Sequence, residues 1–279
     1  MQKEALTVAT AQHFISTEVR ENGHEIRRLM YHAHDANADL IHFPEGALSG
    51  YSKAQISDWQ KVDWARLRQE LEATADLAKQ LGLWTVIGSN HPLGEPHRPH
   101  NSLYVISAAG ELHTRYDKQW CSHTELNDWY TPGQGLGIFE LKGWRFGCAL
   151  CIEIQFPELF MAYAQQEVDC LLFSAYSDSA MFGIQAQAYA ATHNIWFSVA
   201  VPRQMSHGLT SRMIGPDGEL QTLCEAEQST LCISTLDALD ERWKVPLQYA
   251  KPWRKLARKG EIYRTRFVND ARSKNKQIV

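Results

Sequence analysis

The chain has 279 residues, of which 44% are hydrophobic and 22% are charged, and its 28 basic and 32 acidic side chains give a formal charge of −4. These proportions are typical of an ordinary soluble globular protein, and a chain of this length can form one α/β domain with a large core. No stretch approaches the roughly 18 apolar residues that a membrane-spanning helix needs, and the first residues lack the basic start and apolar run of a signal peptide. Composition therefore excludes a membrane-spanning protein, and we expect a cytoplasmic location with no membrane partner.

Strand-like runs alternate with helical stretches along the chain. A strand is predicted over 6–11, an amphipathic helix over 17–36 and a strand over 39–43, which together form a β-α-β opening. A second helix is predicted over 64–81, where Gly82 ends it. Further strands are predicted over 83–88, 101–107, 111–116, 144–150, 169–174, 195–201, 211–214, 220–223 and 229–233, and further helices over 156–167 and 183–193. This alternation, without an internal repeat or a flexible linker, predicts a single α/β domain in which helices cover sheets.

One long connection interrupts the alternation. Residues 117–137 are polar, aromatic and irregular. Long loops without secondary structure of their own are usually functional in compact domains. We therefore expect part of the functional site in this loop.

The six cysteines do not suggest a disulfide framework, because they are spread over a long chain without an export signal. Cys148 and Cys151 form a C-x-x-C spacing, which is compatible with a redox pair or half of a zinc site. No second C-x-x-C or H-x-x-x-H follows. We expect no metal and no cofactor, and we interpret Cys148 as a core residue.

Charge is unevenly distributed along the chain. Residues 251–279 contain ten Lys or Arg against two acidic residues, so this basic tail carries +8 and the remainder of the chain −12. A nucleic-acid-binding arm is one interpretation, but the sequence offers no binding fold or stacking platform for it. We favour a tail that lies on its own acidic body or on a neighbouring subunit, and we expect no nucleic-acid partner.

Three separate places combine a reactive side chain with residues that would hold it at the end of a strand. An apolar strand runs into Pro44 and Glu45, a second strand leads into the long loop at Lys118, and a third reaches Cys151 just before a helix that starts at Pro157. A cysteine on a sharp strand-to-helix turn can present its sulfur outward, with backbone N–H groups nearby. Taken singly, each residue has an ordinary alternative, namely a surface charge or a buried inert thiol.

Together the three places resemble the motifs of the nitrilase superfamily of carbon-nitrogen hydrolases. The nucleophile motif of that family, Gly-x-x-x-Cys-x-Glu/Asp-x-x-Phe-Pro-Glu, is matched by GCALCIEIQFPE at 147–158, with Cys151 as the cysteine. The run FPE that ends at Glu45 is similar to the family's base motif. The run YDK that ends at Lys118 is similar to its lysine motif, and the turn at 132–133 to the turn that follows it.

A later element matches as well, and one stretch departs from the family's pattern. The run SRMIGPDG at 211–218 is similar to the family's Ser-x-x-x-x-Pro-x-Gly, so the resemblance extends from about residue 6 to residue 233. Where the family commonly has Arg-Ala-x-Glu-Asn, this chain has AATHN at 190–194, with His193 replacing the glutamate. Arg203 stands near the place of a frequent asparagine. Because these positions lie near the active-site wall in the family, the resemblance does not name a substrate.

The resemblance implies a hydrolase with a cysteine nucleophile. Cys151 would attack the substrate carbon, Glu45 would carry protons, and Lys118 with the backbone N–H of Ile152 would stabilise the oxyanion. The carbon of an amide or nitrile is a poor electrophile, so its cleavage needs all three of these functions. The reaction would pass through a thioester and release ammonia or an amine.

The remaining expected site residues come mainly from the long loop. Glu125 resembles the family's second glutamate, which holds the lysine and the substrate in position, and Asp128 is the nearby alternative. Trp120, Trp129 and Tyr176 are predicted to line a pocket for a small molecule. Packing in the core or at an interface is the other interpretation of these aromatic residues.

The resemblance also implies an architecture and an assembly. We expect a four-layer α-β-β-α sandwich forming a single domain over 1–250, a basic C-terminal tail over 251–279 at a subunit interface, and a homodimer or higher homo-oligomer. The expected function is hydrolysis of the carbon-nitrogen bond of a small amide or N-carbamoyl compound. A nitrilase acting on a small nitrile, an acyl transferase, and a catalytically idle interaction protein with the same fold stay open as alternatives.

Overall fold

The computed structural model describes residues 3–277, and the chain divides into two compact units, the first ending at Ala238 and the second beginning at Leu239. The first unit contains two six-stranded sheets. One has the spatial order β12 (Thr230–Leu236), β1 (Leu6–Gln12), β2 (Leu40–His42), β3 (Trp84–His91), β4 (His100–Ile106), β5 (Leu112–Asp117). The other has the order β11 (Leu220–Leu223), β10 (Arg212–Ile214), β9 (Trp196–Ala200), β8 (Cys170–Ser174), β7 (Trp144–Leu150), β6 (Gly137–Leu141).

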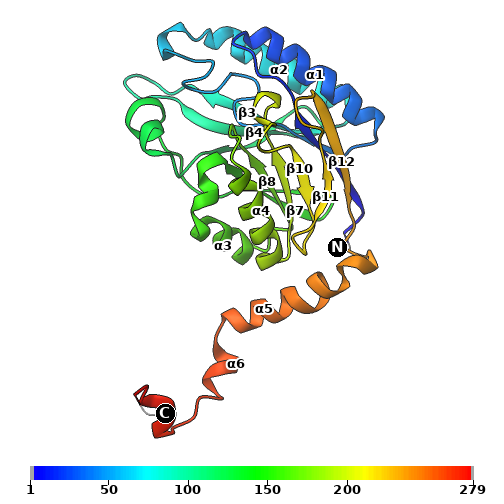
Figure 1. Ribbon diagram of the computed structural model, residues 1–279. Helices are drawn as coiled ribbons and strands as arrows, with labels where there is room; N and C mark the ends of the chain where they lie inside the picture. The colour runs from blue at the N-terminus through cyan, green and yellow to red at the C-terminus, as the bar shows by residue number, and fades with distance from the viewer. Residues whose placement is uncertain (1–2, 278–279) are drawn as a thin grey trace. The chain divides into compact units, whose positions relative to one another are not determined.

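Helices cover the outer face of each sheet (Figure 1). On the first sheet, α1 (Val19–Asp35) and α2 (Trp64–Leu81) contribute a buried apolar stripe that includes Ile26 and Leu77. On the second sheet, α3 (Pro157–Gln165) and α4 (Ala180–His193) do the same through Phe160 and Ala186. The predicted α-β-β-α sandwich is therefore confirmed.

Local sequence signals explain where the second helix starts and stops. The Asp63 carboxylate caps α2 by accepting a hydrogen bond from the Arg66 N–H, and Gly82 ends the helix with φ at +63°. The predicted bounds 64–81 are confirmed residue for residue. The central strand β8 is buried at every position, because parallel strands inside a sandwich are covered on both faces.

The two sheets meet through aromatic and polar contacts. The ring of Trp84 in β3 stacks on that of Phe139 in β6, with centroids 5.8 Å apart. Deeper in the interface the hydroxyl oxygens of Thr10 and Ser198 lie 2.7 Å apart. The strand β6 was not predicted from the sequence, although it completes the second sheet beside β7. The sandwich is thus held together by specific side-chain pairs as well as by apolar burial.

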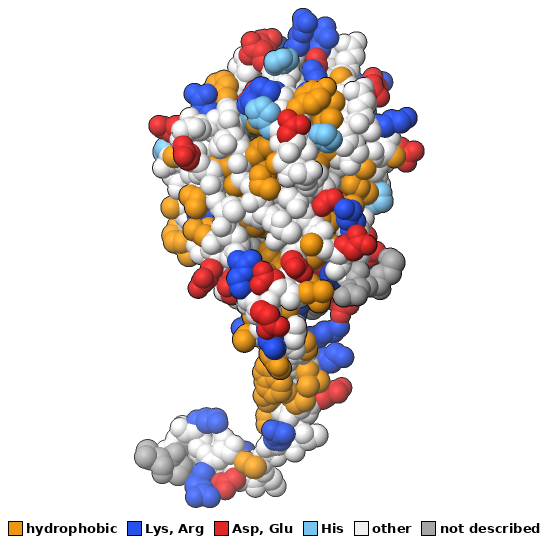
Figure 2. Space-filling view, turned by 90° about the vertical axis from the view of Figure 1, so that its right-hand side faces the viewer, with side chains coloured by type: hydrophobic (Ala, Val, Ile, Leu, Met, Phe, Trp, Pro, Cys, Tyr) orange, Lys and Arg blue, Asp and Glu red, His pale blue; other side chains and the backbone are white. Residues whose placement is uncertain are grey.

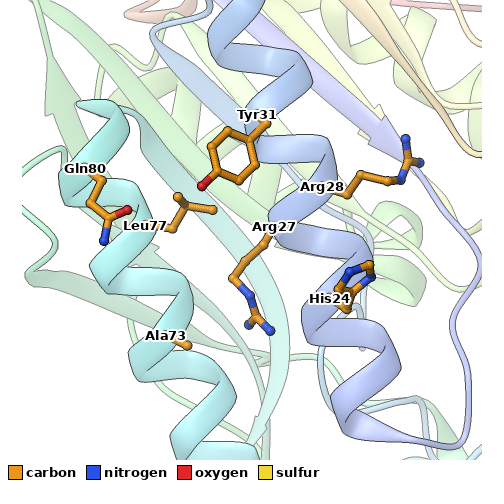
Figure 3. Close-up of a pocket in the computed structure, with 7 residues that line it drawn as sticks. All are labelled: His24, Arg27, Arg28, Tyr31, Ala73, Leu77 and Gln80. Carbon is orange, nitrogen blue, oxygen red and sulfur yellow. The ribbon is translucent and has the colours of Figure 1, made fainter.

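A cavity of about 440 Å³ lies between the two helices of the first outer layer (Figure 3). One wall comes from α1 and the other from α2. The lining residues are His24, Arg27, Arg28, Tyr31, Ala73, Leu77 and Gln80. Two of its cations are already paired, since Arg27 bonds Glu70 and Arg28 bonds Glu25.

The second unit is built from short helical segments. These are η5 (Glu241–Trp243), η6 (Lys244–Ala250), α5 (Lys251–Arg258), α6 (Glu261–Arg264) and α7 (Ala271–Lys274). Large apolar side chains are exposed along it, among them Tyr249 at 61% and Trp253 at 55%, and Figure 2 shows hydrophobic side chains gathered on this segment. The predicted division near residue 250 into a catalytic domain and a tail stays a prediction. Among residues 3–277, no helix combines the length and apolar character needed to cross a bilayer.

Candidate active site

Three charged side chains from separate parts of the chain meet inside the sandwich. Glu45 follows β2, Lys118 follows β5, and Glu125 begins the π-helical turn η2 (Glu125–Trp129) in the long loop. The Lys118 ammonium donates hydrogen bonds to Glu45 Oε1 at 3.0 Å and to Glu125 Oε1 at 2.8 Å. All three side chains are at most 1% exposed. The fold therefore brings together a lysine and two carboxylates that lie up to 80 residues apart in the chain.

The Glu45 carboxylate is fixed by further donors. Its Oε1 also accepts a hydrogen bond from Asn101 Nδ2 at 2.7 Å, and its Oε2 accepts one from the backbone N–H of Tyr176 at 2.8 Å. The backbone around it lies against Gly88, where a Cβ atom would stand 2.2 Å from the carbonyl oxygen of Pro44. A buried carboxylate needs such donors to offset its lost hydration. Glu45 is thus held at one orientation on both of its oxygens.

Cys151 stands at the first position of a 3₁₀ turn, η3 (Cys151–Gln155), immediately after β7. Its φ of +49° lies in the left-handed region, which a residue with a Cβ occupies at a cost and which is frequent at functional sites. The N–H groups that open such a turn, including that of Ile152, have no partner within the turn. The cysteine therefore stands at a strand-to-turn junction beside backbone N–H groups that the turn itself leaves unpaired, and their predicted role as oxyanion donors stays a prediction.

Electrostatics keep the Cys151 thiol protonated at rest. Burial is the main cause that raises the pKa of this thiol well above its ordinary value, and the charge of Glu45 adds to it. The nearby Lys118 ammonium acts in the opposite direction and is outweighed. Because the thiolate is the reactive form of a cysteine, a thiol in this environment becomes a nucleophile only with a base beside it to take its proton. A carboxylate in the same cluster can take that proton.

The lysine and the second glutamate stabilise each other's charge. Burial alone would lower the pKa of the Lys118 ammonium, but Glu45 and Glu125 outweigh burial and hold that pKa well above its usual value. For Glu125, burial would raise the pKa, and the Lys118 ammonium together with the Ser122 N–H, 2.7 Å from Oε2, reverses the shift and lowers it. Both groups are therefore charged at neutral pH.

A third buried carboxylate connects the cysteine turn to the lysine strand. Glu153 Oε2 accepts a hydrogen bond from the Leu150 N–H at 2.7 Å. Its Oε1 accepts bonds from the Tyr116 hydroxyl at 2.7 Å and from the N–H groups of Gln119 and Trp120 at 2.8 and 3.1 Å. Burial raises the pKa of Glu153 despite these donors. Through one side chain, the turn that carries the thiol is joined to the segment that carries the lysine.

Tyr176, whose backbone N–H bonds Glu45, lies beside a second tyrosine, Tyr51. The ring of Tyr176 stacks on that of Tyr51, with centroids 4.9 Å apart and planes 11° from parallel. The Tyr51 hydroxyl donates to Glu125 Oε1 at 3.0 Å. The Tyr176 hydroxyl accepts hydrogen bonds from Gln55 at 2.8 Å and Gln204 at 3.2 Å. The two rings thus form an ordered aromatic wall beside the carboxylates.

The two predicted tryptophans make their ring contacts elsewhere. Trp120 is 41% exposed and stacks on Phe156 at 4.6 Å, and the ring of Trp129 packs edge-on against Trp59 at 5.7 Å. These contacts stabilise the loop that carries Lys118 and Glu125 into the site. Their predicted role in substrate binding stays a prediction.

The residues that depart from the family pattern lie apart from one another. The His193 ring stacks on Tyr189 within α4, and the Arg203 guanidinium lies over the ring of Phe14 at 5.8 Å.

Cys148 is fully buried, and burial raises its pKa to about 12. All six cysteines are free thiols. Within the described part of the chain, no group of three or more His, Cys, Asp or Glu side chains is arranged to hold a metal ion.

Two residues of the cluster were not predicted from the sequence, Tyr51 and Asn101. Asn101 reaches Glu45 because β4 and β5 pair antiparallel, and the Lys118 N–H donates to the Asn101 carbonyl at 2.8 Å. The register of the hairpin around Gly110 was the signal that could have identified it. For Tyr51 the sequence carries no comparable signal, because the segment after Glu45 is irregular.

Comparison with known proteins adds to this geometry. A family model described as "Carbon-nitrogen hydrolase" matches residues 7–244. The chain is 26% identical over 197 residues to a deaminated glutathione amidase of Yersinia enterocolitica, covering 65% of this chain and 68% of that protein. It is 21% identical over 275 residues to the chloroplastic omega-amidase of Arabidopsis thaliana, covering 92% of this chain and 73% of that protein.

Solved structures with the same fold include an amidase from Nesterenkonia sp. and a glutamine-dependent NAD+ synthetase from Acinetobacter baumannii. The amidase superposes with a TM-score of 0.75 at 21% identity, covering 91% of this chain and 98% of that one. The synthetase superposes with a TM-score of 0.72 at 18% identity, covering 84% of this chain and 46% of that one. At these identities the structural likeness establishes the fold.

Proposed function

The chain belongs to the carbon-nitrogen hydrolase family, and from that premise we propose that it is an amidase that cleaves the carbon-nitrogen bond of a small amide or N-carbamoyl compound through a cysteine thioester. The observation that carries the proposal is the Lys118 ammonium, buried between the carboxylates of Glu45 and Glu125 beside the Cys151 turn. Burying three charges is costly, and such arrangements concentrate at catalytic sites. The relatives named above are amidases, which supports an amide substrate.

The proposed first half-reaction forms the thioester. Glu45 takes the proton from the Cys151 thiol as sulfur bonds to the substrate carbonyl carbon. The carbonyl oxygen becomes an oxyanion that accepts hydrogen bonds from the Lys118 ammonium and the Ile152 N–H. When the tetrahedral intermediate collapses, the carbon-nitrogen bond breaks, and Glu45 passes its proton to the departing ammonia or amine.

The proposed second half-reaction consumes water. Glu45 takes a proton from a water molecule whose oxygen bonds to the thioester carbon. The carbon-sulfur bond then breaks, the proton returns to the Cys151 sulfur, and the carboxylic acid leaves. Glu125 acts as a positioning residue throughout, because its carboxylate holds the lysine that faces the oxyanion.

The substrate that we propose is small. The stacked rings of Tyr51 and Tyr176 offer an apolar wall next to the carboxylates, which suits a short acyl chain rather than a polypeptide. Mutants of the Nesterenkonia amidase have been solved in complex with acrylamide and with butyramide. Aliphatic amides of this size are therefore the first compounds to test.

Three alternatives use the same site. A nitrile would need hydration as well as hydrolysis, and an acyl transferase would give the thioester to an acceptor other than water. A catalytically idle interaction protein would not need the buried charges of Lys118, Glu45 and Glu125, which are intact. This favours an active enzyme over an idle one.

Assembly and location belong to the same proposal. We infer a homodimer or higher homo-oligomer in which the C-terminal residues contact another protomer, because exposed rings such as Tyr249 and Trp253 offer an apolar face. The basic side chains of this segment suit an acidic surface on that protomer. Six free thiols fit a reducing compartment, which supports the cytoplasm. Nucleic acid and membrane are not partners in this proposal.

The decisive experiment compares wild type with Cys151→Ala on a pooled set of small amides, N-carbamoyl compounds and nitriles. Ammonia release and intact-mass spectrometry are followed together. We expect ammonia from the wild type alone and an acyl adduct that maps to Cys151. Equal ammonia release from both proteins, or an adduct on another residue, would contradict the proposal, and ammonia from nitriles alone would favour the nitrilase alternative.

A further inference from the structure

A chain of buried hydrogen bonds crosses from one sheet to the other next to the segment that carries Glu45. At the end of β2, the His42 imidazole lies between two serines of the second sheet. Its Nδ1 is 2.8 Å from Ser198 Oγ in β9, and its Nε2 is 2.8 Å from Ser174 Oγ in β8. The chain continues to Thr10 Oγ1, 2.7 Å from Ser198, and to the Phe43 carbonyl, 2.8 Å from Ser174. Thr10, His42, Ser174 and Ser198 are all fully buried.

Counting protons fixes the direction of every bond in this chain. The Ser174 hydroxyl has one hydrogen, and it donates that hydrogen to the Phe43 carbonyl. His42 Nε2 must therefore carry the proton that bonds to Ser174 Oγ. In that tautomer Nδ1 is an acceptor, so Ser198 donates to it, and Thr10 in turn donates to Ser198. The five groups form a single directed sequence that ends on the Phe43 carbonyl.

The imidazole keeps this tautomer because it stays neutral. Burial lowers the pKa of His42 to about 3, so the ring gains no second proton under ordinary conditions. A charged ring would place a donor on Nδ1 and reverse the bonds toward Ser198 and Thr10. The chain is therefore a fixed structural element rather than a pH-sensitive one.

The directed chain ends beside the base of the proposed reaction. Ser174 bonds the carbonyl of Phe43, two residues before Glu45, and Tyr176, two residues after Ser174, donates its N–H to Glu45 Oε2 at 2.8 Å. Two links therefore join the segment 43–45 of one sheet to the segment 174–176 of the other. The outer link holds the Glu45 carboxylate itself, and the inner link depends on the Nε2 proton of His42.

We infer that His42 is a positioning residue for Glu45, which sets the spacing of the two sheets at the active site through Ser174 and the Phe43 carbonyl. This inference rests on the proposed role of Glu45 as the proton carrier. A residue that acts only on stability would lower the folded fraction and leave turnover per folded molecule unchanged. A positioning residue changes turnover, because displacements of about 1 Å in a catalytic group cost up to a hundredfold in rate.

A matched pair of variants separates these two roles. Ser174→Ala and Ser198→Ala each remove one buried hydroxyl that bonds to one nitrogen of the same ring, in adjacent strands of the same sheet. We expect both to lower the thermal midpoint to a similar extent. We expect Ser174→Ala to lower kcat at least tenfold with little change in KM, and Ser198→Ala to lower kcat less than threefold.

A second pair tests the ring itself. The side-chain amide of His42→Gln can place a donor near the Nε2 position, whereas that of His42→Asn reaches only the Nδ1 position. We expect the glutamine variant to recover at least a third of wild-type kcat, and the asparagine variant to behave like Ser174→Ala. Equal losses within either pair, after correction for folded fraction, would overturn the inference.

The readout also distinguishes failure of this inference from failure of the proposed function. If the wild type hydrolyses none of the amides, the proposed function fails, and the rate of Cys151 alkylation by iodoacetamide then replaces kcat for the same four variants. Slower alkylation in Ser174→Ala than in Ser198→Ala supports the inference. Equal alkylation rates overturn it.

Discussion

Two regions of the chain hold their charges in opposite ways. In the cluster formed by Glu45, Lys118 and Glu125, every side chain is at most 1% exposed and the ammonium lies within 3.0 Å of both carboxylates. In the unit that begins at Leu239, basic side chains alternate with exposed rings such as Tyr249 and Trp253. Buried charge persists only where geometry satisfies it, whereas exposed charge adds little to stability. The first arrangement suits chemistry on a small molecule, and the second suits contact with another surface.

The largest effect is expected from removing the shared cation. Lys118→Met leaves two buried carboxylates without their ammonium, so we expect a loss of roughly 3–5 kcal/mol in the free energy of unfolding. Loss of an oxyanion donor should also lower kcat by roughly a hundredfold to a thousandfold. Urea unfolding and steady-state assays measure the two effects separately.

A matched variant in the second region sharpens that result. Lys259→Met removes an exposed cation of the second region, and we expect it to change the unfolding free energy by less than about 0.5 kcal/mol. Similar losses in the two variants would contradict the division between the regions.

The next largest effect is expected from removing the Tyr51 hydroxyl, which was not predicted from the sequence. Tyr51→Phe removes the hydrogen bond to Glu125 Oε1 and keeps the ring that stacks on Tyr176. We expect kcat to fall about tenfold and stability to fall by roughly 2 kcal/mol, the usual worth of a bond to a charged group. Tyr130→Phe is the control, because the structure gives its buried hydroxyl no hydrogen bond to Glu45, Lys118 or Glu125 among residues 3–277. If both variants lose the same activity, the Tyr51 hydroxyl has no special role.

Acid should weaken the buried region in a defined direction. The pKa of Glu125 is lowered in the folded protein, mainly by Lys118 against the effect of burial. Its contribution to stability is therefore present above the ordinary pKa of 4.5 and is lost as the pH falls through the lower folded value. We expect the difference in unfolding free energy between wild type and Glu125→Gln to be constant from pH 6 to 8 and to shrink below about pH 4. A difference that grows in acid would reverse this assignment.

The smallest effect on catalysis is expected in the second region. The double variant Tyr249→Ser with Trp253→Ser removes two exposed rings, and we expect kcat per protomer to change less than twofold. Sedimentation velocity should register a smaller oligomer, since the apolar face that supports association is reduced. An unchanged oligomer mass would show that this surface does not take part in the assembly.

Most of the fold could be predicted because its elements carry local signals. The helix over 64–81 has a capping aspartate before it and a glycine after it, and β7 was predicted over its full length at 144–150. The strand β6 was missed because it begins at the last residue of the expected loop and its five residues mix one charge with apolar side chains. The helices after residue 238 were missed because a run of basic residues indicates charge and not conformation.

The candidate site could be recognised in the sequence where a reactive side chain follows the end of a strand. Glu45, Lys118 and Cys151 each stand at or shortly after the end of a strand, so their resemblance to ordered motifs could be read from the chain. Asn101 and Tyr51 join the cluster through strand register and an irregular loop, which are properties of the folded molecule. Residues that reach the cluster only through strand register or an irregular loop are therefore the part that the sequence does not reveal.

Gly88 contributes to the site because it has no side chain. With a Cβ there, the Pro44 carbonyl oxygen would be only 2.2 Å away, and the backbone N of Gly46 2.7 Å away. Even alanine would force the segment around Glu45 to move by about 1 Å to restore ordinary van der Waals contact, although every side chain named in the mechanism would stay the same. Such a variant would keep all the functional groups of the proposed reaction and still displace one of them. The space at Gly88 is therefore as necessary to the position of Glu45 as the hydrogen bonds that its carboxylate accepts.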